Sequence, residues 1–247
     1  MFELKSGNSE YNTQTLSEIV KNNFKAAAVF EKYNLDFCCK GNKFLSKACE
    51  EKGINEIEIL SELERIKTYQ NSSINYEEWN LDFLIDYIVN TYHSYVRKMI
   101  PVILEHINKV ASVHGKNHPE LTEIARIYSV VYKDLKQHMM KEEEILFPYI
   151  KYLVKTKGNG SKSESPYFGT VRNPISMMEL EHQSAGDELF EIRNLSNNYT
   201  VPQDACNTFR VTFQELKEFE EDLHKHVHLE NSILFPKSIM LEEELKS

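Results

Sequence analysis

The chain has 247 residues, of which 41% are apolar and 27% charged, an ordinary balance for a soluble globular protein. Its formal net charge of -9 argues against nucleic acid as the main partner, because phosphate binding needs a basic surface. No apolar run is long enough to span a bilayer, and the opening residues MFELKSGNSEYN lack the apolar core of a secretory signal. Because the four cysteines show no disulfide-framework spacing, a reducing cytoplasm is the expected location.

Residues 1–66 are predicted to form a small helical domain. Thr15 and Glu18 have the spacing of a capping box and begin a helix whose apolar period runs to Phe30. The segment DFCCKGN (36–42) is a predicted turn, and two short helices follow it. A unit of this size buries little apolar surface on its own.

Residues 67–80 are polar and aperiodic, and they form a predicted linker to a second domain, 81–247. This domain is predicted to be an antiparallel four-helix bundle, because it holds four long amphipathic segments with one long crossover between them. The segments are expected at 81–114, 119–155, 174–197 and 203–235. Pro101 and Pro148 predict bends, and Pro236 predicts the end of the fourth helix.

An eleven-residue phrase, H-x-x-x-E-x-x-I-L-F-P, occurs twice in the bundle, in HMMKEEEILFP (138–148) and HVHLENSILFP (226–236). Each copy carries a histidine and a glutamate four residues apart, so both side chains project from one face of the helix. The pairs are His138 with Glu142 and His226 with Glu230. Both pairs continue the apolar stripe of their helices into the core, where their burial is costly unless a metal ion compensates them.

The other two predicted helices each place one histidine on the inward stripe, His93 and His182. Four imidazoles and two carboxylates, without a thiolate, favour iron or manganese over a structural zinc site. A lone buried histidine is usually a packed core residue, and a lone His-Glu pair is often a surface salt bridge. The duplicated phrase and its core register favour the metal interpretation.

The remaining polar residues near these positions are given smaller roles. Asp134 and Glu181 could orient a ligand imidazole, although solvated acids at a helix edge are the simpler interpretation. Five histidines are predicted to be no part of the centre: His106, His114, His118, His224 and His228.

With these motifs in hand, the sequence resembles the RIC family, the iron-sulfur cluster repair di-iron proteins, whose core domain is hemerythrin-like. DFCC (36–39) resembles the paired-cysteine signature of the family's small N-terminal domain. Four further segments resemble its ligand-bearing helices in the same order: LDFLIDYIVNTYH, HMMKEEEILFP, MELEH and HLENSILFP. The match covers nearly the whole chain.

The resemblance implies a centre of two non-heme iron ions with an oxo or hydroxo bridge. It assigns six iron ligands, with the two glutamates bridging the ions: His93, His138, Glu142, His182, His226 and Glu230. An oxygen-carrying hemerythrin typically uses five histidines, and no fifth histidine is well placed here. The implied function is repair of iron-sulfur clusters damaged by nitric oxide or oxidative stress, with iron-sulfur proteins as partners and no membrane or nucleic acid.

Cys38 and Cys39 are predicted to act as an iron or nitric oxide relay. Adjacent cysteines form only a strained disulfide, and Lys40 could favour a thiolate. The alternative is a half-buried pair of small apolar residues in a turn. Cys49 and Cys206 carry no motif and are expected in the core.

Besides a purely structural bundle without metal, three functional alternatives are open, and repair among them rests on the resemblance. The first is iron donation or cluster repair by a protein that is not a conventional enzyme. The second is an enzyme that reduces nitric oxide or peroxide at the metal pair. The third is a module that binds or senses a diatomic gas, and the missing fifth histidine argues against it. Whether the chain forms a homodimer stays open.

Overall fold

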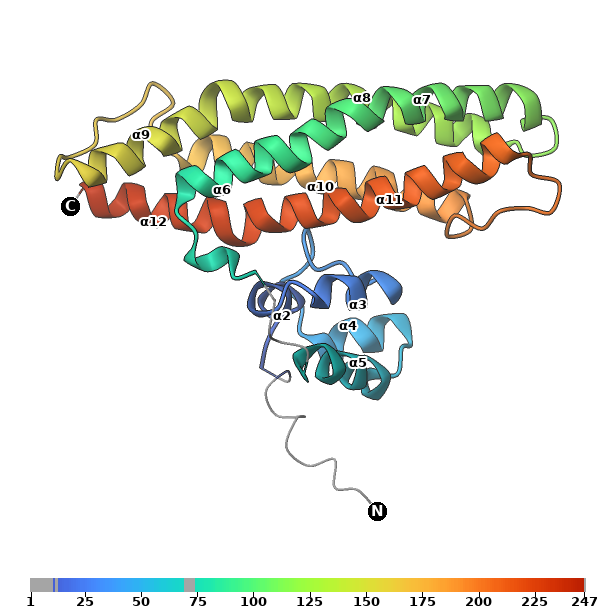
Figure 1. The fold of residues 1–247 in the computed structure, drawn as a ribbon, viewed down its shortest axis with the longest axis horizontal. Helices are drawn as coiled ribbons and strands as arrows, with labels where there is room; N and C mark the ends of the chain where they lie inside the picture. The colour runs from blue at the N-terminus through green and yellow to red at the C-terminus, as the bar shows by residue number, and fades with distance from the viewer. Residues whose placement is uncertain (1–10, 12, 69–73, 247) are drawn as a thin grey trace, which may run out of the picture. The chain divides into compact units, whose positions relative to one another are not determined.

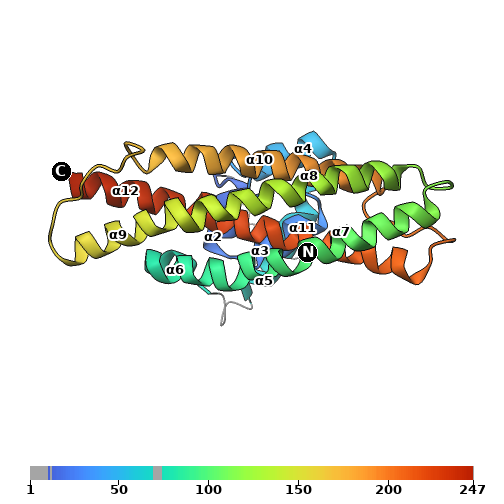
Figure 2. The same cartoon turned by 90° about the horizontal axis from the view of Figure 1, so that it is seen from above.

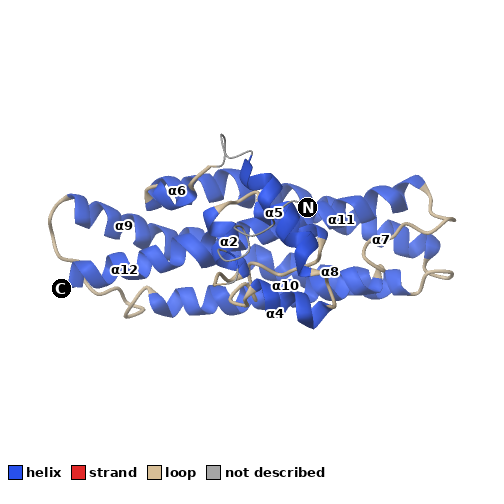
Figure 3. Ribbon diagram, turned by 90° about the horizontal axis from the view of Figure 1, so that it is seen from below, coloured by secondary structure: helices blue, strands red, loops and turns tan. Residues whose placement is uncertain are grey.

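The computed structural model describes residues 11, 13–68 and 74–246, without the side chains of residues 67 and 68. The predictions made on the opening residues and on the middle of the linker, 69–73, therefore lie outside the described residues. Within them the regular structure is helical and no strand is present (Figure 3). None of the helices in this part of the chain is both long and apolar enough to cross a membrane. The all-α prediction is confirmed.

The described residues divide into two compact units. The first combines the described part of 1–80 with Val227–Pro236, and the second combines Leu81–His226 with the residues from Lys237 onward. The sequence boundaries at residues 66 and 80 stay predictions of where separate domains would begin and end.

Helices α2 (Leu16–Asn22), α3 (Ala26–Lys32), α4 (Leu45–Lys52) and α5 (Glu56–Thr68), with the 3-10 turn η2 (Tyr76–Glu78), belong to the first unit. The predicted capping box is present: the Thr15 side chain accepts from the Glu18 amide, and the Glu18 carboxylate accepts from the Thr15 amide. The helix expected to continue to Phe30 is instead interrupted at Asn23. Its extended backbone ends α2, and its side chain accepts from the amide of Lys25, which competes with helical hydrogen bonding.

His228 lies in the core of the first unit and is fully buried. Its ring centroid is 5.7 Å from that of Phe37 and 6.0 Å from that of Phe24. Its Nδ1 is 3.1 Å from the hydroxyl of Ser232, which is 2.8 Å from the hydroxyl of Ser17. Burial lowers the pKa of His228 to about 4, so the ring is a neutral packing residue at physiological pH.

Residues 81–246 form four long antiparallel helical rods, and the segment Val227–Pro236 within the fourth rod is counted with the first unit (Figures 1 and 2). The first rod consists of α6 (Leu81–Ile88), η3 (Val89–His93) and α7 (Ser94–His114). The second consists of α8 (Glu120–Lys141), η4 (Glu142–Leu146) and α9 (Phe147–Gly158). The third is the single helix α10 (Arg172–Leu195). The fourth consists of α11 (Asn207–Leu229), η5 (Glu230–Leu234) and α12 (Phe235–Lys246). The four-helix hemerythrin-like bundle expected from the sequence is confirmed.

The prolines do not end the rods. Pro101 lies inside α7, and Pro148 is the second residue of α9. The prediction that Pro236 ends the fourth rod is wrong, because the helix continues through it to Lys246. Pro148 and Pro236 are each the second residue of the α-helix that follows a π-helical turn, and proline is tolerated in the first turn of a helix.

Glu242 holds the long crossover between α9 and α10. Its side chain is buried and accepts hydrogen bonds from the Tyr149 hydroxyl at 2.8 Å, the Thr170 hydroxyl at 2.5 Å and the Val171 amide at 3.0 Å. Lys246, one turn later on α12, lies 2.9 Å from the same carboxylate. This network explains why a polar connection rich in glycine and serine ends in a fixed position before α10.

Candidate metal centre

Three of the predicted ligands sit at π-helical turns. His93 is the last residue of η3, Glu142 is the first residue of η4 and Glu230 is the first residue of η5. A π turn widens the helix by one residue and re-aims the side chains beside it, and such turns occur often at functional sites. A regular α-helical period cannot reveal this device in the sequence.

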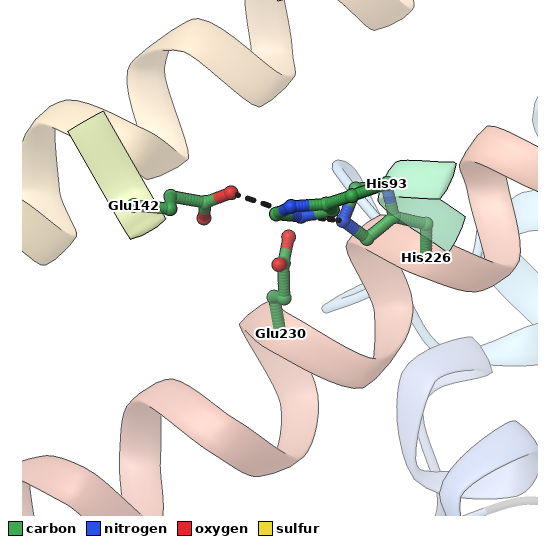
Figure 4. Close-up of side chains that lie close together, drawn as sticks. All are labelled: His93, Glu142, His226 and Glu230. Atoms are coloured by element: carbon green, nitrogen blue, oxygen red, sulfur yellow. Dashed lines mark hydrogen bonds and ion pairs between the residues drawn. The ribbon is translucent and has the colours of Figure 1, made fainter. Parts of the chain in front are cut away.

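The structure brings all six predicted ligands together in two overlapping groups. One group consists of His93, His226, Glu142 and Glu230, and the other of His138, His182 and the same two glutamates. Within each group the candidate ligand atoms lie within 4.8 Å of one another. Figure 4 shows the first group, with the carboxylates of Glu142 and Glu230 directed toward the imidazoles of His93 and His226.

Glu142 lies between the two groups. Its Oε2 atom is 3.4 Å from Nε2 of His93 and 3.3 Å from Nε2 of His138, which belong to different groups. In each group the two imidazole Nε2 atoms also face each other, His93 and His226 at 3.2 Å and His138 and His182 at 3.0 Å. One carboxylate oxygen thus lies near a histidine of each pair, and the two groups share both glutamates.

The donors fit a pair of cations chemically. None of the six side chains is more than 2% exposed, and the Oε2 atom of Glu142 lies within 3.4 Å of Nε2 of both His93 and His138. Two carboxylates buried among four imidazoles are costly, and the positive charge of a metal ion would offset that cost. Imidazole and carboxylate donors suit iron, manganese or catalytic zinc, while the soft thiolate donors of many structural zinc sites are not in this set.

Two further glutamates contact the Nδ1 atoms of His93 and His138, on the side of each ring away from the two groups. Nδ1 of His93 is 2.6 Å from Oε1 of Glu143, which Arg97 also contacts. Nδ1 of His138 is 3.0 Å from Oε2 of Glu181, which Lys141 also contacts. A carboxylate that accepts from Nδ1 fixes the ring and its tautomer, and so directs a basic Nε2 toward the metal position.

The two supporting carboxylates are held in the charged form. Burial raises the pKa of Glu143, but hydrogen bonds with His93 and Arg97 outweigh it, so the net pKa is lowered. The hydrogen bond with His138 lowers the pKa of Glu181 against the effect of burial, and Lys141 adds to the lowering. Both carboxylates are therefore acceptors for the Nδ1–H groups at neutral pH.

The supporting role of Glu143 is not visible in the sequence, and that of Glu181 is only one of two interpretations there. Glu143 lies inside the acidic run KEEEILFP, where the letters do not distinguish a supporting carboxylate from a solvated one. Glu181 is bound to His138 rather than to its sequence neighbour His182, so the simpler interpretation of a solvated acid is wrong. Asp134, the other candidate, is exposed to solvent.

Most of the histidines predicted to stand apart have other contacts. His106 is 2.7 Å from Glu215, and His118 is 3.1 Å from both Glu120 and Asp204. Within the described residues, none of the five belongs to either His-Glu group. Cys38 and Cys39 form a third group, with Asp36, within the first unit.

Family models match both parts of the chain. Residues 84–238 match the hemerythrin HHE cation binding domain, and residues 12–67 match ScdA_N, described as a domain of unknown function (DUF542). The first match covers all six residues of the two groups and bears out a cation-binding bundle. The second covers Cys38 and Cys39.

Curated relatives match the chain over nearly its full length. The iron-sulfur cluster repair protein YtfE of Pectobacterium atrosepticum is 34% identical, over 93% of this chain and 98% of its own. A probable iron-sulfur cluster repair protein of Haemophilus influenzae is 36% identical over 91% and 96% of the two chains. YtfE of Yersinia pestis is 33% identical over 93% and 98%. With the bundle, the His-Glu groups and both domain matches in agreement, the chain belongs to the hemerythrin-like iron-sulfur cluster repair family.

Proposed function

We propose that this chain is a di-iron protein that repairs iron-sulfur clusters damaged by nitric oxide or oxidative stress, or supplies iron to them. The observation that carries the proposal is the shared Oε2 of Glu142 between His93 and His138. It supports two cations rather than one, and the names of the relatives indicate what such a centre serves. The proposed clients are iron-sulfur proteins, and the proposed location is the cytoplasm.

In this proposal His93 and His226 would hold one iron ion, His138 and His182 would hold the other, and Glu142 and Glu230 would be shared by both, together with an oxo or hydroxo group. Two histidines, two shared carboxylates and that group would give each ion five donors, which would leave about one position of a six-coordinate shell open. When bound, the metal pair supplies exchangeable coordination positions for iron transfer or for small ligands such as nitric oxide. The protein's own part is to present neutral Nε2 donors and to exclude bulk water.

Access to the centre is supported by a cavity beside it. A cavity of about 360 Å³ is lined by Arg97, Tyr132, Lys136, Met139 and Glu143, among others. Glu143 also contacts Nδ1 of His93, so one carboxylate touches both the cavity and a ligand ring. We propose this side of the bundle as the place where a small ligand or an iron ion approaches. The cysteine pair, as an iron or nitric oxide relay, is part of the same proposal.

The test is a reconstituted repair assay. The anaerobically purified protein, loaded with iron, is mixed with a [4Fe–4S] enzyme that nitric oxide has inactivated, and recovery of the enzyme is followed. Glu142→Gln should abolish recovery, and Glu105→Gln, at an exposed position of α7 outside the cavity lining, should not. Recovery that is equal with Glu142→Gln would contradict the proposal.

The main rival is a nitric oxide or peroxide reductase at the same metal pair. Two metal ions bridged by carboxylates can activate a small ligand jointly. Turnover of nitric oxide under anaerobic reducing conditions distinguishes the two functions. A rapid catalytic rate without any client protein would favour the reductase, and slow or stoichiometric consumption would favour iron supply.

A further inference from the structure

We propose that Asp36, Cys38 and Cys39 form a second metal site, separate from the His-Glu centre, for a thiophilic divalent cation such as Zn²⁺ or Fe²⁺. One carboxylate oxygen of Asp36 and the two Sγ atoms lie within 4.8 Å of one another. The site stands on the geometry of the first unit alone. Its existence does not depend on the function proposed for the bundle.

The backbone of the loop holds the two cysteines in place. Oδ1 of Asp36 accepts hydrogen bonds from the amide of Cys38 at 3.0 Å and from the amide of Cys39 at 2.9 Å. The other end of the loop is tied to α2, because the amide of Ser17 donates to the carbonyl of Gly41 at 2.9 Å. These hydrogen bonds order the loop and fix both sulfur atoms beside the carboxylate of Asp36.

The sulfur atoms have the separation that one metal ion requires. The two Sγ atoms are 3.7 Å apart, far longer than the roughly 2.05 Å of a disulfide bond, so the two thiols are not joined. Two thiolates bound at about 2.3 Å with tetrahedral angles would lie roughly 3.8 Å apart. The observed distance agrees with chelation of one cation without rearrangement of the loop.

The surroundings of the loop suit a cation that can exchange. Cys38 is buried, while Cys39 and Asp36 are partly exposed, so the site can be reached from solvent. Three protein donors leave one tetrahedral position for water or for a group from another molecule. The hydrogen bond with Cys39, burial and the nearby Asp36 all raise the pKa of Cys38 and so favour its thiol form. A bound dication would instead favour the thiolate.

The experiment uses the reduced full-length protein under anaerobic conditions, with Co²⁺ as the probe. Thiolate-to-cobalt charge-transfer absorption reports cysteine ligands only, so cobalt in the His-Glu centre does not contribute to it. In the wild type, one equivalent of Co²⁺ should produce this absorption, in addition to any Co²⁺ that the bundle binds. Cys38→Ser and Cys39→Ser should each abolish it, and Asp36→Asn should weaken cobalt binding at least about ten-fold.

The matched controls are the two cysteines outside the loop. Cys49 is buried in the same unit, and Cys206 is exposed; Cys49→Ser and Cys206→Ser should leave the absorption unchanged. Absence of the absorption in the wild type, or its persistence in Cys38→Ser, would overturn the site. Unchanged affinity in Asp36→Asn would overturn the three-ligand assignment.

A second measurement needs no variant and covers the case in which a substitution prevents folding. Zn²⁺ should slow the alkylation of Cys39 in the wild type by about ten-fold or more, since a coordinated thiolate is a poor nucleophile. The rate at Cys206 serves as the internal reference. Equal rates at Cys39 with and without Zn²⁺ would also overturn the proposal.

Discussion

Nδ1 of His93 lies 2.6 Å from Oε1 of Glu143, and Arg97, four residues after His93 on the same rod, contacts that carboxylate. The same arrangement occurs in the other His-Glu group, where Glu181 lies between His138 and Lys141. Each proposed iron ion thus has one histidine whose ring is fixed by a carboxylate and a cation. The two halves of the centre are supported alike, although their carboxylates come from different rods.

Glu143→Gln is expected to weaken iron binding by about 10- to 100-fold and to shift the optical spectrum of the centre. The amide still fills the space but is a weaker acceptor for the Nδ1–H of His93, so Nε2 becomes a poorer donor. Iron affinity by competition with a chelator and the absorption spectrum are the measurements. Glu144→Gln should change neither property, and equal effects of the two variants would argue against a supporting role for Glu143.

Glu242→Leu is expected to destabilise the bundle by about 3 kcal/mol, because it leaves the buried partners of that carboxylate without an acceptor. The crossover 159–171 should lose its protection in hydrogen exchange before the rest of the bundle does. Glu244→Leu, which removes an exposed residue that pairs with Lys157, is the control and should cost little. Unchanged exchange in 159–171 would show that Glu242 does not hold the crossover.

Asp222 predicts a pH-dependent stability. Burial raises the pKa of this carboxyl to about 6, against a small lowering by Lys225, and its Oδ2 accepts no hydrogen bond among the described residues. A carboxyl with a raised folded-state pKa favours folding when protonated. Its contribution is therefore favourable at low pH and is lost as the pH rises from about 4 to about 6.

Asp222→Asn should accordingly stabilise the protein by roughly 1–2 kcal/mol at about pH 8, and the gain should shrink toward about pH 5. Chemical denaturation of the metal-free protein at several pH values measures it. The same series with Glu221→Gln, the preceding residue on α11, provides the comparison. A gain that does not depend on pH would mean that the charge of Asp222 carries no penalty.

Gly41→Ala tests how firmly the cysteine loop is built. A Cβ atom at this position would stand 2.2 Å from the carbonyl oxygen of Phe37, so the backbone must move. We expect a loss of about 1–3 kcal/mol in the first unit and faster alkylation of Cys39. Gly158→Ala, where a Cβ meets nothing within 4 Å, should leave both unchanged.

The bundle and the six clustered residues could be predicted because they carry strong periodic signals. The repeat H-x-x-x-E-x-x-I-L-F-P places His138 and Glu142 in the same stripe as apolar core residues, and tertiary packing preserves that register. Their assignment as iron ligands stays a prediction until metal is measured. The π turns at His93, Glu142 and Glu230 could not be predicted, because the apolar period of the sequence does not distinguish a single π turn from regular α-helix.

Contacts between distant segments were also beyond the sequence. No sequence motif links Glu143 to His93 or Glu242 to Val171. The two residues of each pair are far apart in the sequence and meet only when the chain packs. Pro236 was predicted to end the fourth helix because a proline inside a helix removes a backbone hydrogen bond. It lies instead in the first turn of α12, which follows the π turn η5 and tolerates proline. His228 was set aside because it is not on the ligand face, and its role is to pack in the first unit.

The most direct test of the centre is to count its iron. The protein is purified anaerobically after expression with iron, iron is measured by elemental analysis, and optical spectra are recorded for the wild type and Glu142→Gln. The account predicts about two iron ions per chain in the wild type, with an absorption that is lost or strongly altered in the variant. Less than about one iron per chain in the wild type, or an unchanged spectrum in Glu142→Gln, would contradict it.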